Sequence, residues 1–113
     1  MKEIKAYIKA IKRESVTRAL HQIEGLTGAS FSNVLGFGRG KEKSSGYNPD
    51  ADPSGYVKHV KVEVVCSNKL TDQVIEVIRH AAHTGLRGDG KIYVSDINDA
   101  VRIQSGERGI SAI

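Results

Sequence analysis

The order of the hydrophobic patterns along the chain is the strongest constraint on what it can fold into. Near the start, apolar residues alternate with other residues, which predicts a strand over residues 4–11. Its core side comprises Ile4, Ala6, Ile8 and Ala10. We expect a helix next, ending at Gly25, and a second strand over residues 30–37. The helix is indicated by apolar residues at positions i, i+3, i+4 and i+7, namely Val16, Ala19, Leu20 and Ile23.

The second half of the chain repeats this order. Alternating valines predict a strand over residues 57–66. A helix is expected to follow, capped by Ser67 or Asn68 and ending at residues 84–85. Its apolar positions are Leu70, Val74, Val77, Ile78 and Ala81. Two further strands are predicted, one over residues 91–94 and a short last one over residues 100–103.

Two strand–helix–strand units in tandem predict an α+β chain with the ferredoxin-like arrangement. We therefore expect residues 1–113 to form one domain, with two helices on one face of a four-stranded antiparallel sheet. The other face carries apolar residues too, so self-association is the simplest way to cover it. At this length a monomer buries only ~60–68% of its unfolded surface, and an oligomer would gain stability.

A long stretch of unusual composition joins the two halves. Residues 36–55 contain five of the 12 glycines and both prolines, with very few apolar side chains. Such a segment cannot order itself by burying apolar surface. Long loops in small domains are usually functional, and the alternative here is an insertion that has no function.

A second glycine-rich segment lies between the second helix and the following strand. Residues 84–91 read Thr-Gly-Leu-Arg-Gly-Asp-Gly-Lys, so glycine lets the backbone come close to a ligand while Arg87 and Lys91 add positive charge. The spacing matches neither of the common phosphate-binding fingerprints. Phosphate binding and a merely tight turn both remain open. Two weaker clusters of glycine and basic residues occupy residues 36–41 and 102–109.

Composition excludes several classes of protein. The chain is 39% hydrophobic and 27% charged, which is typical of a globular protein and not of a disordered one. It has no apolar run long enough to span or insert into a membrane, and its N-terminus lacks the pattern of a secretory signal. The single cysteine, Cys66, reads as a small core residue and fits a reducing cytoplasm. The net charge of +4 is scattered and aromatic residues are 5%, which disfavours nucleic acid as a partner.

Three segments together carry a resemblance to a known family. Residues 36–39, residues 84–91 and residues 100–107 resemble, in order and spacing, the PII nitrogen-regulatory signal-transduction family. The likeness extends over essentially the whole chain. In the family's terms, residues 38–56 are the T-loop, residues 84–91 the B-loop and residues 102–113 the C-terminal loop.

The resemblance implies a homotrimer that binds ATP or ADP in clefts between subunits, with Mg²⁺ as an accompanying ion. It places the adenine at Gly28, Ala29, Ser30 and Val65, and the base of the T-loop at Gly36, Phe37, Gly38 and Arg39. It places the phosphates at Arg87, Gly88, Asp89, Gly90 and Lys91, with Arg102 and Arg108 reaching over from the neighbouring subunit. It implies no catalytic residue and at most a slow ATPase. The expected partner is a membrane transporter or a metabolic enzyme, controlled through the T-loop.

Five positions depart from the pattern of the family. Gly40 replaces a glutamine that helps to bind Mg²⁺ and 2-oxoglutarate, and His59 replaces a lysine tied to the same effector, so sensing of 2-oxoglutarate is doubtful. Asp52 replaces the tyrosine that many members modify, and Asp50 occupies a position where some carry a phosphorylated serine. Gln104 replaces a second arginine of the C-terminal loop.

An alternative from another class is a regulatory trimer of the same fold that binds a metal ion or a small anion. Two sets of side chains offer ligands of the right type, one on the second helix and one in the long loop. They are Glu76, His80 and His83, and Glu42, Asp50 and Asp52. Solvated polar residues are the commoner explanation for the helix set. No residue is assigned to a metal site from the sequence.

Overall fold

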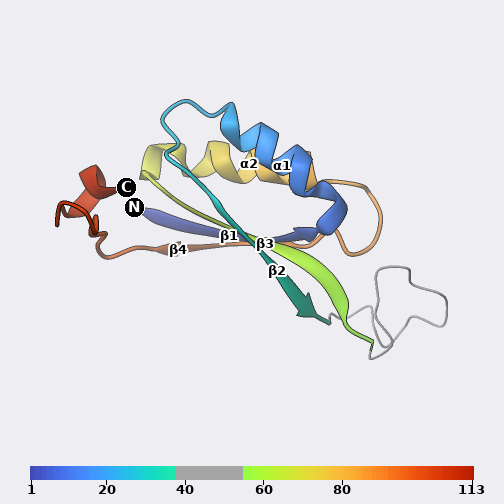
Figure 1. The fold of residues 1–113 in the computed structure, drawn as a ribbon. Coiled ribbons are helices and arrows are strands. Elements are labelled where there is room, and N and C mark those ends of the chain that lie inside the picture. Colours follow the sequence, from blue (N-terminus) through green and yellow to red (C-terminus); the bar gives the residue numbers. More distant parts are fainter. Residues whose placement is uncertain (38–54) are drawn as a thin grey trace.

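The chain forms a single antiparallel sheet with two helices packed side by side on one of its faces (Figure 1). The computed structural model describes residues 1–37 and 55–113. In chain order the elements are β1 (Lys2–Lys9), α1 (Arg13–His21), β2 (Ser30–Gly36), β3 (Val57–Cys66), α2 (Thr71–Ala82) and β4 (Lys91–Asp96). The strand order is β2-β3-β1-β4 and every neighbouring pair is antiparallel. The predicted ferredoxin-like α+β fold is confirmed.

The hydrophobic core lies between the sheet and the helices, where the alternating pattern put it. Every second residue is buried from Ile4 to Ile8 in β1 and from Val60 to Cys66 in β3, because successive side chains of a strand point to opposite faces. The helices supply the other side of the core through apolar residues three and four positions apart. The largest fully buried side chains are Ile4, Ile8, Val16, Val60, Val62, Val64, Val74 and Ile78. Cys66 is also buried, which confirms its reading as a core residue.

The first strand is shorter than the alternation predicted. It ends at Lys9, and Ala10 is exposed in a short 3₁₀ helix, Ala10–Lys12. The chain has to leave the sheet at this point for α1 to pack over the face. Ser15 fastens the start of α1, since its hydroxyl lies 3.1 Å from the Lys12 carbonyl oxygen and 2.9 Å from that of Ala81 at the end of α2.

The predicted cap of the second helix is wrong. Neither Ser67 nor Asn68 caps the chain with its side chain; a 3₁₀ turn, Asn68–Leu70, separates β3 from α2. The Leu70 amide donates to the Ser67 carbonyl at 3.1 Å, and the Thr71 hydroxyl donates to the same oxygen at 3.3 Å. Backbone bonds of the tight turn therefore take the place of the side-chain cap.

The short last strand predicted over residues 100–103 is also wrong. After β4 the chain leaves the sheet, and one isolated pair, Val101 with Arg108, is all the strand pairing it makes within the described residues. The Gly106 amide donates to the Arg102 carbonyl at 2.8 Å, and Gly106 and Gly109 both have positive φ. These two glycines turn the segment back on itself, so it cannot extend along the edge of β4.

The face of the sheet opposite the helices carries apolar residues, as the sequence predicted, among them Tyr7, Tyr93 and Val65, and it carries charged residues as well. The register puts Glu3, Lys5 and Tyr7 of β1 beside Glu63 and Lys61 of β3 on this face. Two ion pairs form there, Lys5 with Glu3 at 3.6 Å and Lys61 with Glu63 at 3.3 Å. This face therefore combines balanced charge with a few apolar groups.

No helix in the two described ranges is both long and apolar enough to cross a membrane.

The core makes a direct prediction for stability. Ile78 of α2 is 0% exposed, so we expect Ile78→Ala to lower the free energy of unfolding by about 2–5 kcal/mol through lost apolar contacts and a residual cavity. Ile11, 78% exposed, is the matched control, and Ile11→Ala should change it by less than about 0.5 kcal/mol. Urea unfolding followed by circular dichroism measures both. Equal effects would contradict this account of the core.

Candidate functional site

The predicted binding residues divide between two opposite ends of the sheet. Gly36 ends β2 and Lys91 begins β4, and both positions lie at the end where β1 finishes, since Tyr7 pairs with Lys91 and Lys9 with His59. Phe37 and the 84–91 loop adjoin this end. Gly38 and Arg39 lie outside the described residues.

The remaining predicted residues lie at the other end. Ser30 begins β2 opposite Glu63, so Gly28 and Ala29, which precede it, come beside the end of β3 where Val65 lies. The segment that carries Arg102 and Arg108 follows β4 at this same end, where the Ile97 amide donates to the Met1 carbonyl at 3.0 Å (Figure 1). The predicted set thus falls into two groups, which we name after the part of the ligand predicted for most of their members. The phosphate half comprises Gly36, Phe37 and residues 87–91, and the adenine half comprises residues 28–30, Val65, Arg102 and Arg108.

Glycine shapes the 84–91 loop, as the sequence predicted. Gly85, Gly88 and Gly90 all have positive φ, which other residues rarely adopt. Gly90 is the most constrained of the three, because a Cβ there would lie 1.6 Å from the Tyr7 carbonyl oxygen. The loop therefore passes directly against the backbone of β1 and only glycine fits at this contact.

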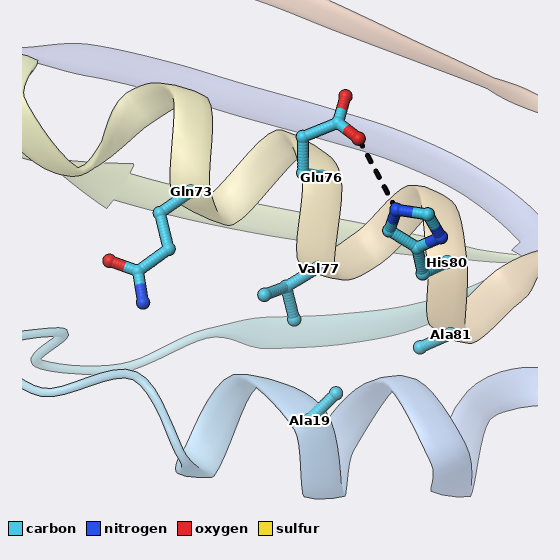
Figure 2. A pocket seen from close by; sticks show the side chains of 6 residues that line it. All are labelled: Ala19, Gln73, Glu76, Val77, His80 and Ala81. Carbon is cyan, nitrogen blue, oxygen red and sulfur yellow. Dashed lines mark ion pairs between the residues drawn. The ribbon is translucent and has the colours of Figure 1, made fainter.

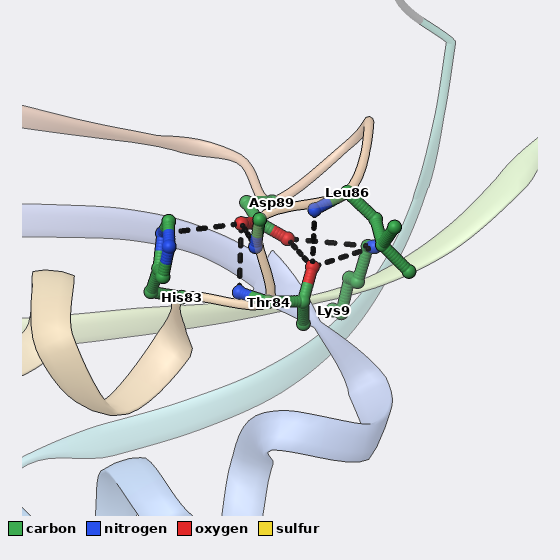
Figure 3. A network of polar contacts seen from close by, with 6 residues as sticks. Lys9, His83, Thr84, Leu86 and Asp89 are labelled. Atoms are coloured by element: carbon green, nitrogen blue, oxygen red, sulfur yellow. Dashed lines mark hydrogen bonds and ion pairs between the residues drawn. The ribbon is translucent and has the colours of Figure 1, made fainter.

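The carboxylate of Asp89 is the centre of a polar network within this loop (Figure 3). It accepts hydrogen bonds from the Thr84 amide at 2.8 Å, from the Gly85 amide at 3.1 Å and from the Thr84 hydroxyl. The Lys9 ammonium lies 3.4 Å away and the His83 ring nitrogen 3.6 Å away. The Thr84 hydroxyl, followed by the Thr84 and Gly85 amides and Lys9, holds the pKa of the Asp89 carboxyl well below its usual range.

Lys9 is a member of this network that the sequence analysis missed. Its side chain is 15% exposed, and its ammonium donates to the Thr84 hydroxyl at 3.2 Å. The position of Lys9 in this network follows from the pairing of β1 with β4, in which Lys2 pairs with Asp96 and Tyr7 with Lys91. Continuing that register by two residues puts Lys9 opposite Asp89, but it can be found only once the two strands are known to pair.

The basic residues of the adenine half are held by acidic neighbours within their own segment. A guanidinium nitrogen of Arg102 lies 3.7 Å from the Glu107 carboxylate, and the other donates to the Ser111 carbonyl at 3.1 Å. Arg108 lies 3.7 Å from Asp99. These pairs are exposed, so they contribute little stability and an anionic ligand could replace the acidic partner.

The residues that depart from the family pattern are only partly described. His59 lies on β3 opposite Val34, and Gln104 is exposed in the turn after Arg102. Gly40, Asp50 and Asp52 lie outside the described residues.

The three candidate metal ligands of the second helix do not come together, which corrects the expected helical face. The helix α2 ends at Ala82, so His83 is extended and lies beside Asp89. Glu76 and His80 remain 3.4 Å apart, beside the groove between α1 and α2 that Figure 2 shows. Hydrogen bonding and charge from Arg79, then His80, lower the pKa of Glu76.

Within residues 1–37 and 55–113 no group of three metal-ligating side chains occurs. Glu42, like Asp50 and Asp52, lies outside these residues.

Comparison with known proteins identifies the class. The family model described as nitrogen regulatory protein P-II matches residues 1–107. Curated proteins named nitrogen regulatory protein P-II from Azospirillum brasilense and Rhodospirillum rubrum are 42% and 43% identical over all 113 residues and over the full length of both chains. The protein of the same name from Bradyrhizobium diazoefficiens is 42% identical over the same span. This chain belongs to the P-II family. It is a signalling protein of nitrogen regulation and not an enzyme.

The contact between Gly90 and β1 predicts that alanine substitutions at Gly90 and at Gly88, in the same loop, lower the free energy of unfolding by different amounts. We expect Gly90→Ala to displace the loop and lower the free energy of unfolding, because its Cβ would overlap the Tyr7 carbonyl and its φ of 104° is unfavourable for alanine. Gly88→Ala is the matched control, since Gly88 has a similar φ of 83° and its nearest neighbour is the Lys9 Cε at 3.9 Å. Gly88→Ala should cost about 1–3 kcal/mol and Gly90→Ala clearly more, as measured by thermal unfolding. A Gly90→Ala protein as stable as the control would refute the close approach.

Proposed function

We propose that this protein senses ATP and ADP in clefts between the subunits of a homotrimer, and controls a transporter or a metabolic enzyme through residues 38–56. The nucleotide lies with its phosphates at the phosphate half of one subunit and its adenine at the adenine half of the next. Bound ATP and bound ADP favour different conformations of the segment that contacts the partner, and that difference is the signal.

The observation that carries this proposal is the division of the site. Strand β2 runs from Ser30 to Gly36, and at about 3.3 Å per residue it separates the two half-sites by roughly 20 Å. The two groups lie at its opposite ends. One ligand contacted by both groups must therefore lie between two copies. A contact that joins one end of a subunit to the other end of the next is head-to-tail, and such contacts form a ring when the rotation from one subunit to the next closes, as it does in a trimer.

The exposed surface of the chain supports an oligomer. Most of the large apolar side chains of the C-terminal segment point into solvent: Ile103 is 100% exposed, Ile110 57% and Val101 50%. Apolar groups gathered on one segment are typical of a surface that a partner covers. The sheet face opposite the helices adds alternating charges, which can pair with those of a second copy.

The charges of the two half-sites suit a polyphosphate. Arg87 and Lys91 are exposed at the phosphate half, and Arg102 is exposed at the adenine half. Guanidinium and ammonium groups form strong charge-assisted hydrogen bonds with phosphate oxygens. In the proposed cleft the phosphates replace the Glu107 carboxylate as the partner of Arg102. This replacement costs little because the Arg102–Glu107 ion pair is exposed.

A subunit-mixing experiment tests the location of the site. We expect the unaltered protein to bind ATP and ADP in calorimetric titrations, and Lys91→Ala or Arg102→Ala to weaken binding by roughly ten-fold or more, the size of a lost hydrogen bond to a charged group. When the two variants are unfolded, mixed in equal amounts and refolded together, about a quarter of the clefts combine an intact half from each variant. Binding of normal affinity should return in that fraction. A chain carrying both substitutions, refolded alone, is the control and should recover none. Failure of the mixture to recover any binding would contradict a shared cleft.

The sequence of the loop predicts the response to a second effector. Because Gly40 lacks the side-chain oxygen of a glutamine, we expect 2-oxoglutarate to leave the affinity for ATP nearly unchanged in the presence of Mg²⁺. Titrations of ATP with and without 2-oxoglutarate measure this. Gly40→Gln is the informative variant, since it restores the missing group. A large increase in ATP affinity on adding 2-oxoglutarate to the unaltered protein would show that other ligands replace that oxygen.

A further inference from the structure

We propose that Thr84, Asp89 and Lys9 form a clamp that holds the 84–91 loop in the conformation that receives the phosphates. These three residues position the loop and do not themselves contact the nucleotide. The inference rests on the proposed function, and it assigns separate roles to residues that the resemblance had grouped together as a phosphate-binding segment.

The hydroxyl of Thr84 connects the parts of the clamp, since each of its hydrogen-bonding positions is used. It donates to the Asp89 carboxylate, and it accepts from the Lys9 ammonium at 3.2 Å and from the Leu86 amide at 3.0 Å. One donor and two acceptor positions are the full capacity of a hydroxyl group. It therefore ties three separate parts of the chain: the end of β1, the start of the loop and its far side.

Asp89 is committed to the loop in the same way. Both of its oxygens receive hydrogen bonds from Thr84 or Gly85, and its side chain is 25% exposed. A negative charge beside a phosphate site would repel the ligand if it were unpaired. Lys9, at 3.4 Å, offsets that charge, so Arg87 and Lys91 are left to act on the phosphates.

The division of the backbone amides points to the same roles. Hydrogen bonds inside the loop use the amides of Thr84, Gly85 and Leu86. No hydrogen bond within the described residues uses the amides of Arg87 and Gly88. The clamp thus fixes the first half of the loop and presents the amides of its turn to a ligand. Fixing a binding loop in advance raises affinity because less conformational entropy is lost when the ligand binds.

The test compares two substitutions at one position. Thr84→Val removes the hydroxyl at nearly constant shape, and Thr84→Ser keeps it. We expect Thr84→Val to weaken ATP and ADP binding by about ten-fold, and Thr84→Ser to stay within about three-fold of the unaltered protein. Amide exchange of Leu86 in the nucleotide-free protein should be slow in the unaltered protein and in Thr84→Ser, and fast in Thr84→Val. A Thr84→Val protein that binds as tightly as the unaltered one, or a Thr84→Ser protein as weak as Thr84→Val, overturns the clamp.

Two further variants separate positioning from direct contact. Asp89→Asn should weaken binding by the same factor with and without Mg²⁺; a loss seen only with Mg²⁺ would make Asp89 a ligand of the metal ion and overturn the assignment. Lys9→Met should also weaken binding, and adding it to Asp89→Asn should cause little further loss, because the two residues act as a unit. Additive losses would instead indicate that Lys9 contacts the phosphates.

The outcome for the unaltered protein distinguishes this inference from the proposed function. If it binds neither ATP nor ADP, the proposed function fails. The exchange of the Leu86 amide then still decides the clamp, because that measurement needs no nucleotide.

Discussion

The register of β1 with its two neighbours is the constraint on which the rest of the structure depends. Ile4, Ala6 and Ile8 face the helices only in this register, because a slip of one residue would move every side chain of the strand to the other face. The same slip would take Lys9 away from Asp89 and the Tyr7 carbonyl away from Gly90. The free energy that drives core formation therefore also brings Lys9, Tyr7 and the glycine-rich loop together, and the hydrogen bonds of Thr84 and Asp89 then hold the loop in place.

Local patterns in the sequence predicted the elements well, and they failed where the chain leaves an element. Alternation and helical spacing report which residues are buried, so β1, β3 and α2 were found in the right order. Alternation continues through Ala10, yet the chain must turn there to bring α1 over the sheet. Residues 100–103 have a strand-like composition, but what decides their structure is the pair of glycines that follows them. Such ends depend on tertiary packing, which a short window of sequence does not contain.

The candidate site was likewise predictable only in part. Alternating glycine and charge revealed the 84–91 loop, because those residue types are needed wherever a backbone must approach an anion. The role of Lys9 was not visible, since it depends on a pairing between positions 80 residues apart. Asp89 offered a signal that could have been used: a carboxylate in a loop that is predicted to bind anions requires a cation close by. The helical pattern overestimated the length of α2. The helix ends at Ala82, so His83 does not lie on the same helical face as Glu76 and His80.

The division of the binding residues has a consequence for signalling under the proposed function. Each nucleotide contacts the phosphate half of one subunit and the adenine half of the next, so occupancy is coupled to assembly as well as to the conformation of either chain. The phosphate half includes Gly36 and Phe37, which directly precede residues 38–56, while the adenine half, with residues of β2, β3 and the C-terminal segment, belongs to a neighbour. A change from ATP to ADP alters the charge beside the loop and leaves the adenine contacts in place. The number of phosphates is then sensed beside the loop that must respond, by Arg87 and Lys91 of its own subunit together with Arg102 of the neighbouring subunit, and the adenine serves to select the class of ligand.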